Sequence, residues 1–117
     1  MRAKRAAFVA GVGLLMAAPV LAHHSFKAEY DETRQDTLTG IITKVLWKNP
    51  HVMLSIDVKD DSKTTSWELE LASPNGLMSQ GWKVDSLKPG DQVTATGFPA
   101  KDGANLLSAK KITVDAH

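Results

Sequence analysis

The chain of 117 residues contains no cysteine, which excludes disulfide bonds, thiol catalysis and thiolate metal sites. Small exported domains often depend on disulfides, so this one must be stabilised by strand pairing and core packing. The sequence also lacks the G-x-S-x-G, H-E-x-x-H, P-loop and dinucleotide-binding motifs. With no recognisable catalytic set, we expect a binding protein rather than an enzyme.

The first 22 residues have the three parts of a secretory signal peptide. These are a positively charged start at residues 2–5, an uncharged apolar run over 6–18, and a signal-peptidase site at Val20-Leu21-Ala22. The apolar run is shorter than the roughly 20 residues that a membrane-spanning helix needs. The chain also has neither a twin-arginine pair nor a cysteine for a lipid anchor. We therefore expect an N-terminal signal helix that is cleaved during general secretory export, leaving a periplasmic protein with no membrane attachment.

Cleavage would also change the charge. The full chain has 14 basic and 13 acidic residues, and the leader carries Arg2, Lys4 and Arg5. The mature chain would keep 11 basic against 13 acidic residues, a formal charge of −2. Nucleic-acid binding depends on clustered positive charge. The composition therefore predicts no nucleic-acid partner. The residues considered below predict a metal ion or a small ligand instead, or an envelope protein.

The residues after the leader are enough for one domain with one modest core. Residues 23–36 are polar and without periodicity, which predicts an extended arm that Phe26 and Tyr30 pin to the body. Residues 37–117 are rich in β-branched residues and short turns, which predicts a β-domain. The expected organisation is therefore a leader over 1–22, an arm over 23–36 and a single β-domain.

Two neighbouring segments predict a β-hairpin. Apolar and polar residues alternate over 51–58 and again over 65–72, and a period of two indicates half-buried strands. Pairing Val58 with Thr65 makes every inward residue face another inward residue, whereas a slip of one position would turn the apolar set to water. The register is therefore predicted together with the strands.

The remaining elements follow from residue types and turn signals. They are a bent strand, a short helix and two final strands, over 37–47, 74–80, 92–98 and 106–114. Gly40 is the expected bulge in the bent strand, and Ser73 is the expected cap of the helix. The order β-β-β-α-β-β predicts a mostly β fold, a small five-stranded OB-like barrel with one short helix.

The outer face of the predicted hairpin carries two carboxylates, Glu68 and Glu70. The register places Met53 opposite Glu70. General acid–base catalysis needs two carboxylates in different environments, whereas an exposed pair on a sheet is typical of a solvated surface.

The histidines suggest a metal site. Cleavage after Ala22 would make His23 the first residue, so that its α-amine and imidazole could chelate a metal together. His51 begins the second predicted strand on the outer face, where it could add a third nitrogen. Tetragonal nitrogen coordination favours Cu(II), so copper is the candidate metal. His24 and Met53 are the candidate auxiliary ligands.

The same residues also fit plainer roles. His23 and His24 are typical polar residues of a chain end, and His51 fits a strand-end residue that bonds to a backbone group. Trp47 with Phe26 fits a stacking platform for a ligand, and Trp47 alone fits a plug for the end of a barrel. The alternative function is therefore a non-metal binding module for a sugar, a peptide or an envelope protein.

Four short motifs together resemble a family of short exported bacterial proteins of unassigned function. They are Ala22-His23-His24-Ser25-Phe26, the W-x-N-P-H segment at 47–51, Ser73-Pro74-Asn75 and Lys88-Pro89-Gly90-Asp91. The resemblance implies a periplasmic single domain made with a signal peptide. It places the paired histidines and His51 among the motif residues, and it implies no activity.

Overall fold

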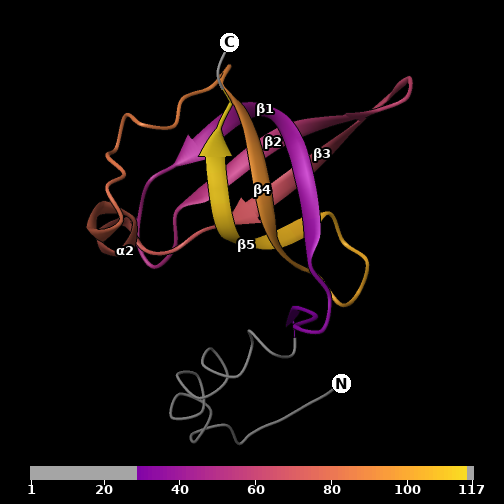
Figure 1. Cartoon of the computed structure of the whole chain (residues 1–117), viewed down its shortest axis with the longest axis horizontal. Helices are drawn as coiled ribbons and strands as arrows, with labels where there is room; N and C mark the ends of the chain where they lie inside the picture. The colour runs from indigo at the N-terminus through magenta and orange to yellow at the C-terminus, as the bar shows by residue number, and fades with distance from the viewer. Residues whose placement is uncertain (1–28, 116–117) are drawn as a thin grey trace, which may run out of the picture.

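A computed structural model describes residues 29–115 of the chain. In this part five strands close into a barrel in the order β1-β2-β3-β5-β4 (Figure 1). The elements are β1 (Asp36–Leu46), β2 (Met53–Asp60), β3 (Lys63–Glu70), α2 (Pro74–Ser79), β4 (Gln92–Pro99) and β5 (Leu106–Val114). The closed barrel and the order β-β-β-α-β-β confirm the predicted OB-like fold. The expected signal helix over 1–22 lies outside the described residues.

The β2–β3 hairpin has the predicted register. Val58 faces Thr65, and Leu54 faces Leu69. Leu54, Ile56 and Leu69 have no exposed surface, and burying a side chain of this size stabilises the fold by about 1.5–3 kcal/mol. The hairpin tip projects from the barrel on the side away from α2 (Figure 1).

The bulge of β1 is not at Gly40, so that prediction is wrong. The register with β2 shifts between Ile42 and Lys44 instead. Gly40 has a different purpose, because a Cβ there would lie 2.6 Å from the carbonyl oxygen of Asp57. The glycine thus permits a close approach of two backbones, which sequence pattern alone does not distinguish from a bulge.

The helix and the turn before β4 form as their residues predict. Ser73 caps α2 by accepting a hydrogen bond from the Gly76 N–H at 3.1 Å. In the turn over 88–91, Gly90 has a φ of 95°, which the third position of a type II turn requires. No helix within residues 29–115 is long and apolar enough to cross a membrane.

The barrel wall opens between β3 and β5. These strands pair in parallel over only three residues, ending with Glu70 and Ser108. Beyond Ser108, β5 continues to Val114 against β4 alone. The edge of β5 that follows Ser108 therefore faces α2 and the loop after it rather than another strand.

Candidate functional site

A cleft of about 630 Å³ occupies this opening. Its walls come from the end of the N-terminal arm, His51, the end of β3, α2 with the loop that follows, and the second half of β5. The fold thus brings together segments that are far apart in the sequence, and the titratable side chains of the site lie among them.

His51 lies just before β2, and its two ring nitrogens have different surroundings. Nδ1 is 2.8 Å from the carbonyl oxygen of Leu71. Because a carbonyl only accepts, Nδ1 must carry the proton. Nε2 is 3.4 Å from Oε2 of Glu70. In the neutral ring this nitrogen presents a lone pair beside a carboxylate, whose negative charge would favour a metal ion bound there.

Tyr30 anchors the arm beside this pair. Its ring is buried, and its hydroxyl donates to Oε1 of Glu70. The backbone on either side bonds to the end of β4 and the turn after it: the Asp31 N–H donates to the carbonyl of Pro99, and the Glu29 carbonyl accepts from the Lys101 N–H, both at 2.8 Å. Burial, and then the hydrogen bond and charge of Glu70, raise the pKa of Tyr30 far above its usual range. The phenol therefore stays neutral and orients Glu70 toward His51.

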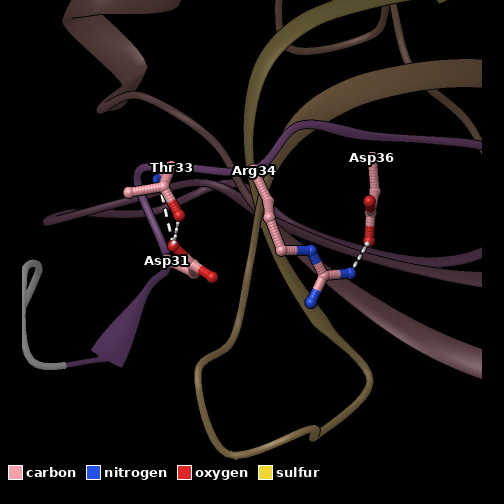
Figure 2. Close-up of polar contacts among 4 residues, drawn as sticks. All are labelled: Asp31, Thr33, Arg34 and Asp36. Carbon is pink, nitrogen blue, oxygen red and sulfur yellow. Dashed lines mark hydrogen bonds and ion pairs between the residues drawn. The ribbon is translucent and has the colours of Figure 1, made fainter.

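A tight turn carries the chain from Tyr30 into β1 (Figure 2). The Asp31 carboxylate accepts hydrogen bonds from the Thr33 backbone N–H at 3.0 Å and from the Thr33 hydroxyl at 2.5 Å. These bonds, the side-chain bond first, hold the pKa of Asp31 below its usual value. Arg34 then pairs with Asp36 at 3.2 Å. The turn is exposed, so it directs the arm more than it stabilises the fold.

The β5 side of the cleft carries a serine hydroxyl and two lysines that form no hydrogen bond or ion pair with other described side chains. Ser108 is only 8% exposed, and its hydroxyl has no hydrogen-bond partner among residues 29–115. A buried polar group without a partner costs on the order of 1–3 kcal/mol. Lys110 and Lys111 also line the cleft, and neither forms an ion pair within the described part of the chain. The Lys110 ammonium lies 5.8 Å from the centroid of the Phe98 ring.

The predicted site residues separate into three groups. His51 lines the cleft and bonds to a backbone carbonyl. Met53 and Trp47 are partly buried and do not line it; Met53 faces Glu70 across the hairpin, and Trp47 packs against the core. His23, His24 and Phe26 lie outside the described residues. Within residues 29–115 no group of three or more His, Asp or Glu side chains is placed to hold a metal ion.

Sequence reasoning missed two residues of this site. Glu70 was expected on a solvated face, but it is partly buried beneath Tyr30. The signal available was the arm's own aromatic residue, since a tyrosine pinned to the body needs a polar partner for its hydroxyl. For Ser108 no signal stood out, because a serine in a strand is ordinary until its burial is known.

A family model matches the chain over residues 12–108. The chain belongs to DUF6152, a family of unknown function. This match covers most of the chain and confirms the resemblance to a family without an assigned activity. Among curated proteins none matches the chain in sequence.

Solved structures similar to this fold include single-stranded DNA-binding proteins. The mitochondrial protein Rim1 of S. cerevisiae is 14% identical with a TM-score of 0.54, over 69% of this chain and 93% of Rim1. A small single-stranded DNA-binding protein of Streptomyces coelicolor is 18% identical with a TM-score of 0.50, over 70% and 92% of the two chains. At these identities the likeness shows the OB fold alone.

The expectation that excluded nucleic acid is wrong. It was drawn from a formal charge of −2, yet the fold of this DUF6152 protein is one that single-stranded DNA-binding proteins use. The physical reason is that net charge is a sum over the whole surface, whereas a partner meets one local surface. Lys110 and Lys111 stand together on β5, and a whole-chain sum hides such a pair.

Proposed function

We propose that this DUF6152 protein is a small exported binding protein that holds a copper ion in the periplasm. His51 supplies one imidazole nitrogen. His23, as the first residue after cleavage at Ala22, supplies its α-amine and its imidazole. These three nitrogens suit the tetragonal geometry of Cu(II), with His24 or Met53 as an auxiliary ligand.

The observation that carries this proposal is the place where the arm meets the barrel. Glu29 and Tyr30 line the same cleft as His51. His23 precedes Glu29 by six residues, which span at most about 20 Å when extended. The N-terminus therefore needs to bridge only this short stretch, rather than the 28 residues that separate His23 from His51 in the sequence.

The surroundings of His51 also support a metal-binding role. Histidine ligands commonly donate their second ring N–H to a backbone carbonyl or a carboxylate, which fixes the ring. The bond from Nδ1 to Leu71 is of this kind and leaves Nε2 available. The side chain is 48% exposed, so an ion can reach it, and the Glu70 carboxylate offers compensating negative charge.

Export is part of the same proposal. The free α-amine of His23 exists only after the leader is removed at Ala22, which links periplasmic export to formation of the site. The charged start, apolar run and cleavage motif of residues 1–22 support that step. Without cleavage, His23 would contribute its imidazole alone.

The test is a Cu(II) titration of the processed protein, with its N-terminus confirmed by intact mass. We expect tight one-to-one binding and an EPR signal of nitrogen-rich tetragonal copper. Both His51→Ala and one alanine inserted ahead of His23 should weaken binding by at least about ten-fold. His117→Ala is the matched control and should bind like the parent. Weak binding that ignores the first two changes would refute the copper site.

A second candidate is binding of single-stranded nucleic acid, the activity named for the Rim1 and Streptomyces proteins. The observation that favours it is the Lys110 ammonium near the Phe98 ring, because cations and aromatic rings together hold phosphates and bases. Fluorescence anisotropy with labelled oligothymidylate tests it. Binding that weakens steeply with salt and is lost in Lys110→Gln/Lys111→Gln would favour this function over copper.

A further inference from the structure

We infer that the cleft between α2 and β5 binds a small organic anion with a planar apolar body. Lys110 and Lys111 hold the anionic group, and the Ser108 hydroxyl donates a hydrogen bond to it. This site goes beyond the proposed copper function and does not depend on it, since none of these three residues is a proposed metal ligand.

A strand irregularity places both lysines at the cleft. Consecutive side chains of a regular strand point to opposite faces. In β5 the pairing with β4 shifts, so that Lys111 faces Thr96 while Ala109 faces Gly97. Lys110 is the extra residue of this bulge, and both lysines line the cleft. Two consecutive lysines that line the cleft, with no carboxylate partner among residues 29–115, bring two positive charges to this wall.

Two acidic residues line the cleft, Glu29 and Glu70. No ion pair joins Glu29 to Lys110 or Lys111 among residues 29–115, and the Glu70 carboxylate is already engaged. Glu70 accepts from the Tyr30 hydroxyl through one oxygen and faces His51 through the other. Its carboxylate is therefore directed along the arm side of the cleft, and no ion pair joins it to Lys110 or Lys111 in the described structure. Lys111 therefore has no charged partner in the described residues, and the Lys110 ammonium, 5.8 Å from the centroid of the Phe98 ring, turns from that ring to the ligand when the anion binds.

Ser108 supplies an independent observation. The residue is only 8% exposed and lines the cleft, and its hydroxyl has no partner among residues 29–115. Buried polar groups are nearly always satisfied, so this hydroxyl calls for an acceptor. An oxygen of a carboxylate or sulfonate held by the neighbouring lysines is such an acceptor.

The rest of the cleft suits an apolar body. Trp82, Leu77 and Ile112 line it on the α2 side and on β5, and an indole offers a flat face for a ring. The volume of about 630 Å³ lies within the roughly 300–1,000 Å³ that is usual for sites of small organic ligands. Charge at one side and an aromatic wall at the other define the ligand class.

The test uses two fluorescent probes that share one skeleton. Anilinonaphthalene sulfonate carries an anionic group, and phenylnaphthylamine is the same ring system without it. Both are titrated into the processed protein in the presence of EDTA, which removes copper, and energy transfer from tryptophan reports binding of the probe. We expect one saturable site that binds the sulfonate at least about ten-fold more tightly than the neutral probe.

Variants separate this site from the surface and from the metal. Lys110→Gln/Lys111→Gln should abolish the preference for the sulfonate, and Ser108→Ala should weaken sulfonate binding several-fold. Lys59→Gln/Lys63→Gln, on the hairpin tip, removes the same charge and should leave binding unchanged. His51→Ala should lose copper but keep the probe, so the two proposals fail separately. Circular dichroism confirms that each variant is folded.

Four results would overturn the inference. Equal affinity for the two probes would show that charge plays no part. Sulfonate binding at several sites would show that the cleft does not hold the anion. Binding that is unchanged in Lys110→Gln/Lys111→Gln would show the same. Displacement of the probe by oligothymidylate with a steep salt dependence would assign the lysines to a nucleic-acid backbone instead.

Discussion

The Tyr30 hydroxyl donates a hydrogen bond to the Glu70 carboxylate across 40 positions of sequence. This bond joins the N-terminal arm to the end of β3, and Glu70 in turn faces the imidazole of His51. The arm is therefore part of the cleft wall rather than an appendage, and the position of His51 relative to the N-terminus depends on one tyrosine.

Tyr30 should resist ionisation as long as the protein is folded. It is the only tyrosine of the chain, so the absorbance of tyrosinate reports on it alone. Because burial and Glu70 raise its pKa, the folded protein should show no tyrosinate near pH 10, whereas the protein unfolded in urea should titrate there. Titration of the folded protein near pH 10 would contradict the buried hydrogen bond.

The same shift predicts a loss of stability at alkaline pH. Below the unfolded-state pKa both states hold the proton, and the contribution of Tyr30 is fully present. Above about pH 10 the unfolded state loses its proton while the folded state keeps it, so the free energy of unfolding falls as pH rises. Urea unfolding at pH 8 and pH 11 measures the difference. In Tyr30→Phe this part of the alkaline loss should disappear.

Tyr30→Phe should destabilise the protein by about 1–3 kcal/mol, because Glu70 loses a donor while it stays partly buried. A double-mutant cycle with Glu70→Gln measures the coupling between the two side chains. We expect the double variant to be less destabilised than the sum of the single variants. Simple additivity would mean that the bond contributes nothing to stability.

Sequence reasoning was strongest where a single alternation decides the structure. The hairpin register was predicted because a slip would expose Leu54, Ile56 and Leu69 together. The prediction of a bulge at Gly40 was wrong, because both a bulge and a close approach of two backbones favour glycine. The residue type alone does not distinguish the two. The difference is set by Asp57 on the neighbouring strand, and only the closed barrel shows which backbone comes near.

The site was predicted less completely than the fold. His51 was predicted to begin the second strand, whereas it lies two residues before β2. Its bond to the Leu71 carbonyl matches the plainer of the two roles considered for it, because that role depends only on a position near a strand end. Glu70 was predicted to be exposed, because its burial depends on where the N-terminal arm packs against the barrel. Ser108 lines the cleft because β3 and β5 stop pairing at this residue. That separation depends on how the whole barrel closes, so no short segment of sequence predicts it.

Two glycines should be irreplaceable for steric reasons. A Cβ at position 97 would lie 1.9 Å from the carbonyl oxygen of Ser108, and one at position 40 would lie 2.6 Å from that of Asp57. We expect Gly97→Ala to destabilise by about 3 kcal/mol or more and Gly40→Ala by less.

Gly103→Ala is the matched control for these two substitutions. Gly103 has a φ of 84° and no atom within 4 Å of its would-be Cβ, so only backbone strain of about 1 kcal/mol is expected. Chemical denaturation ranks the three variants. A smaller loss in Gly97→Ala than in Gly103→Ala would show that the β4–β5 approach is looser than the structure has it.

The last prediction concerns the tautomer of His51. Leu71 offers only an acceptor to Nδ1, so the neutral ring should carry its proton there and leave Nε2 bare. Correlation of ring protons with ring nitrogens by NMR at pH 8, where histidines are ordinarily neutral, identifies the form. Glu70→Gln should keep it, because a glutamine amide can donate to the bare Nε2. If Nε2 carries the proton in the neutral ring, then a metal ion would have to displace that proton, and the preset ligand geometry inferred for His51 would be wrong.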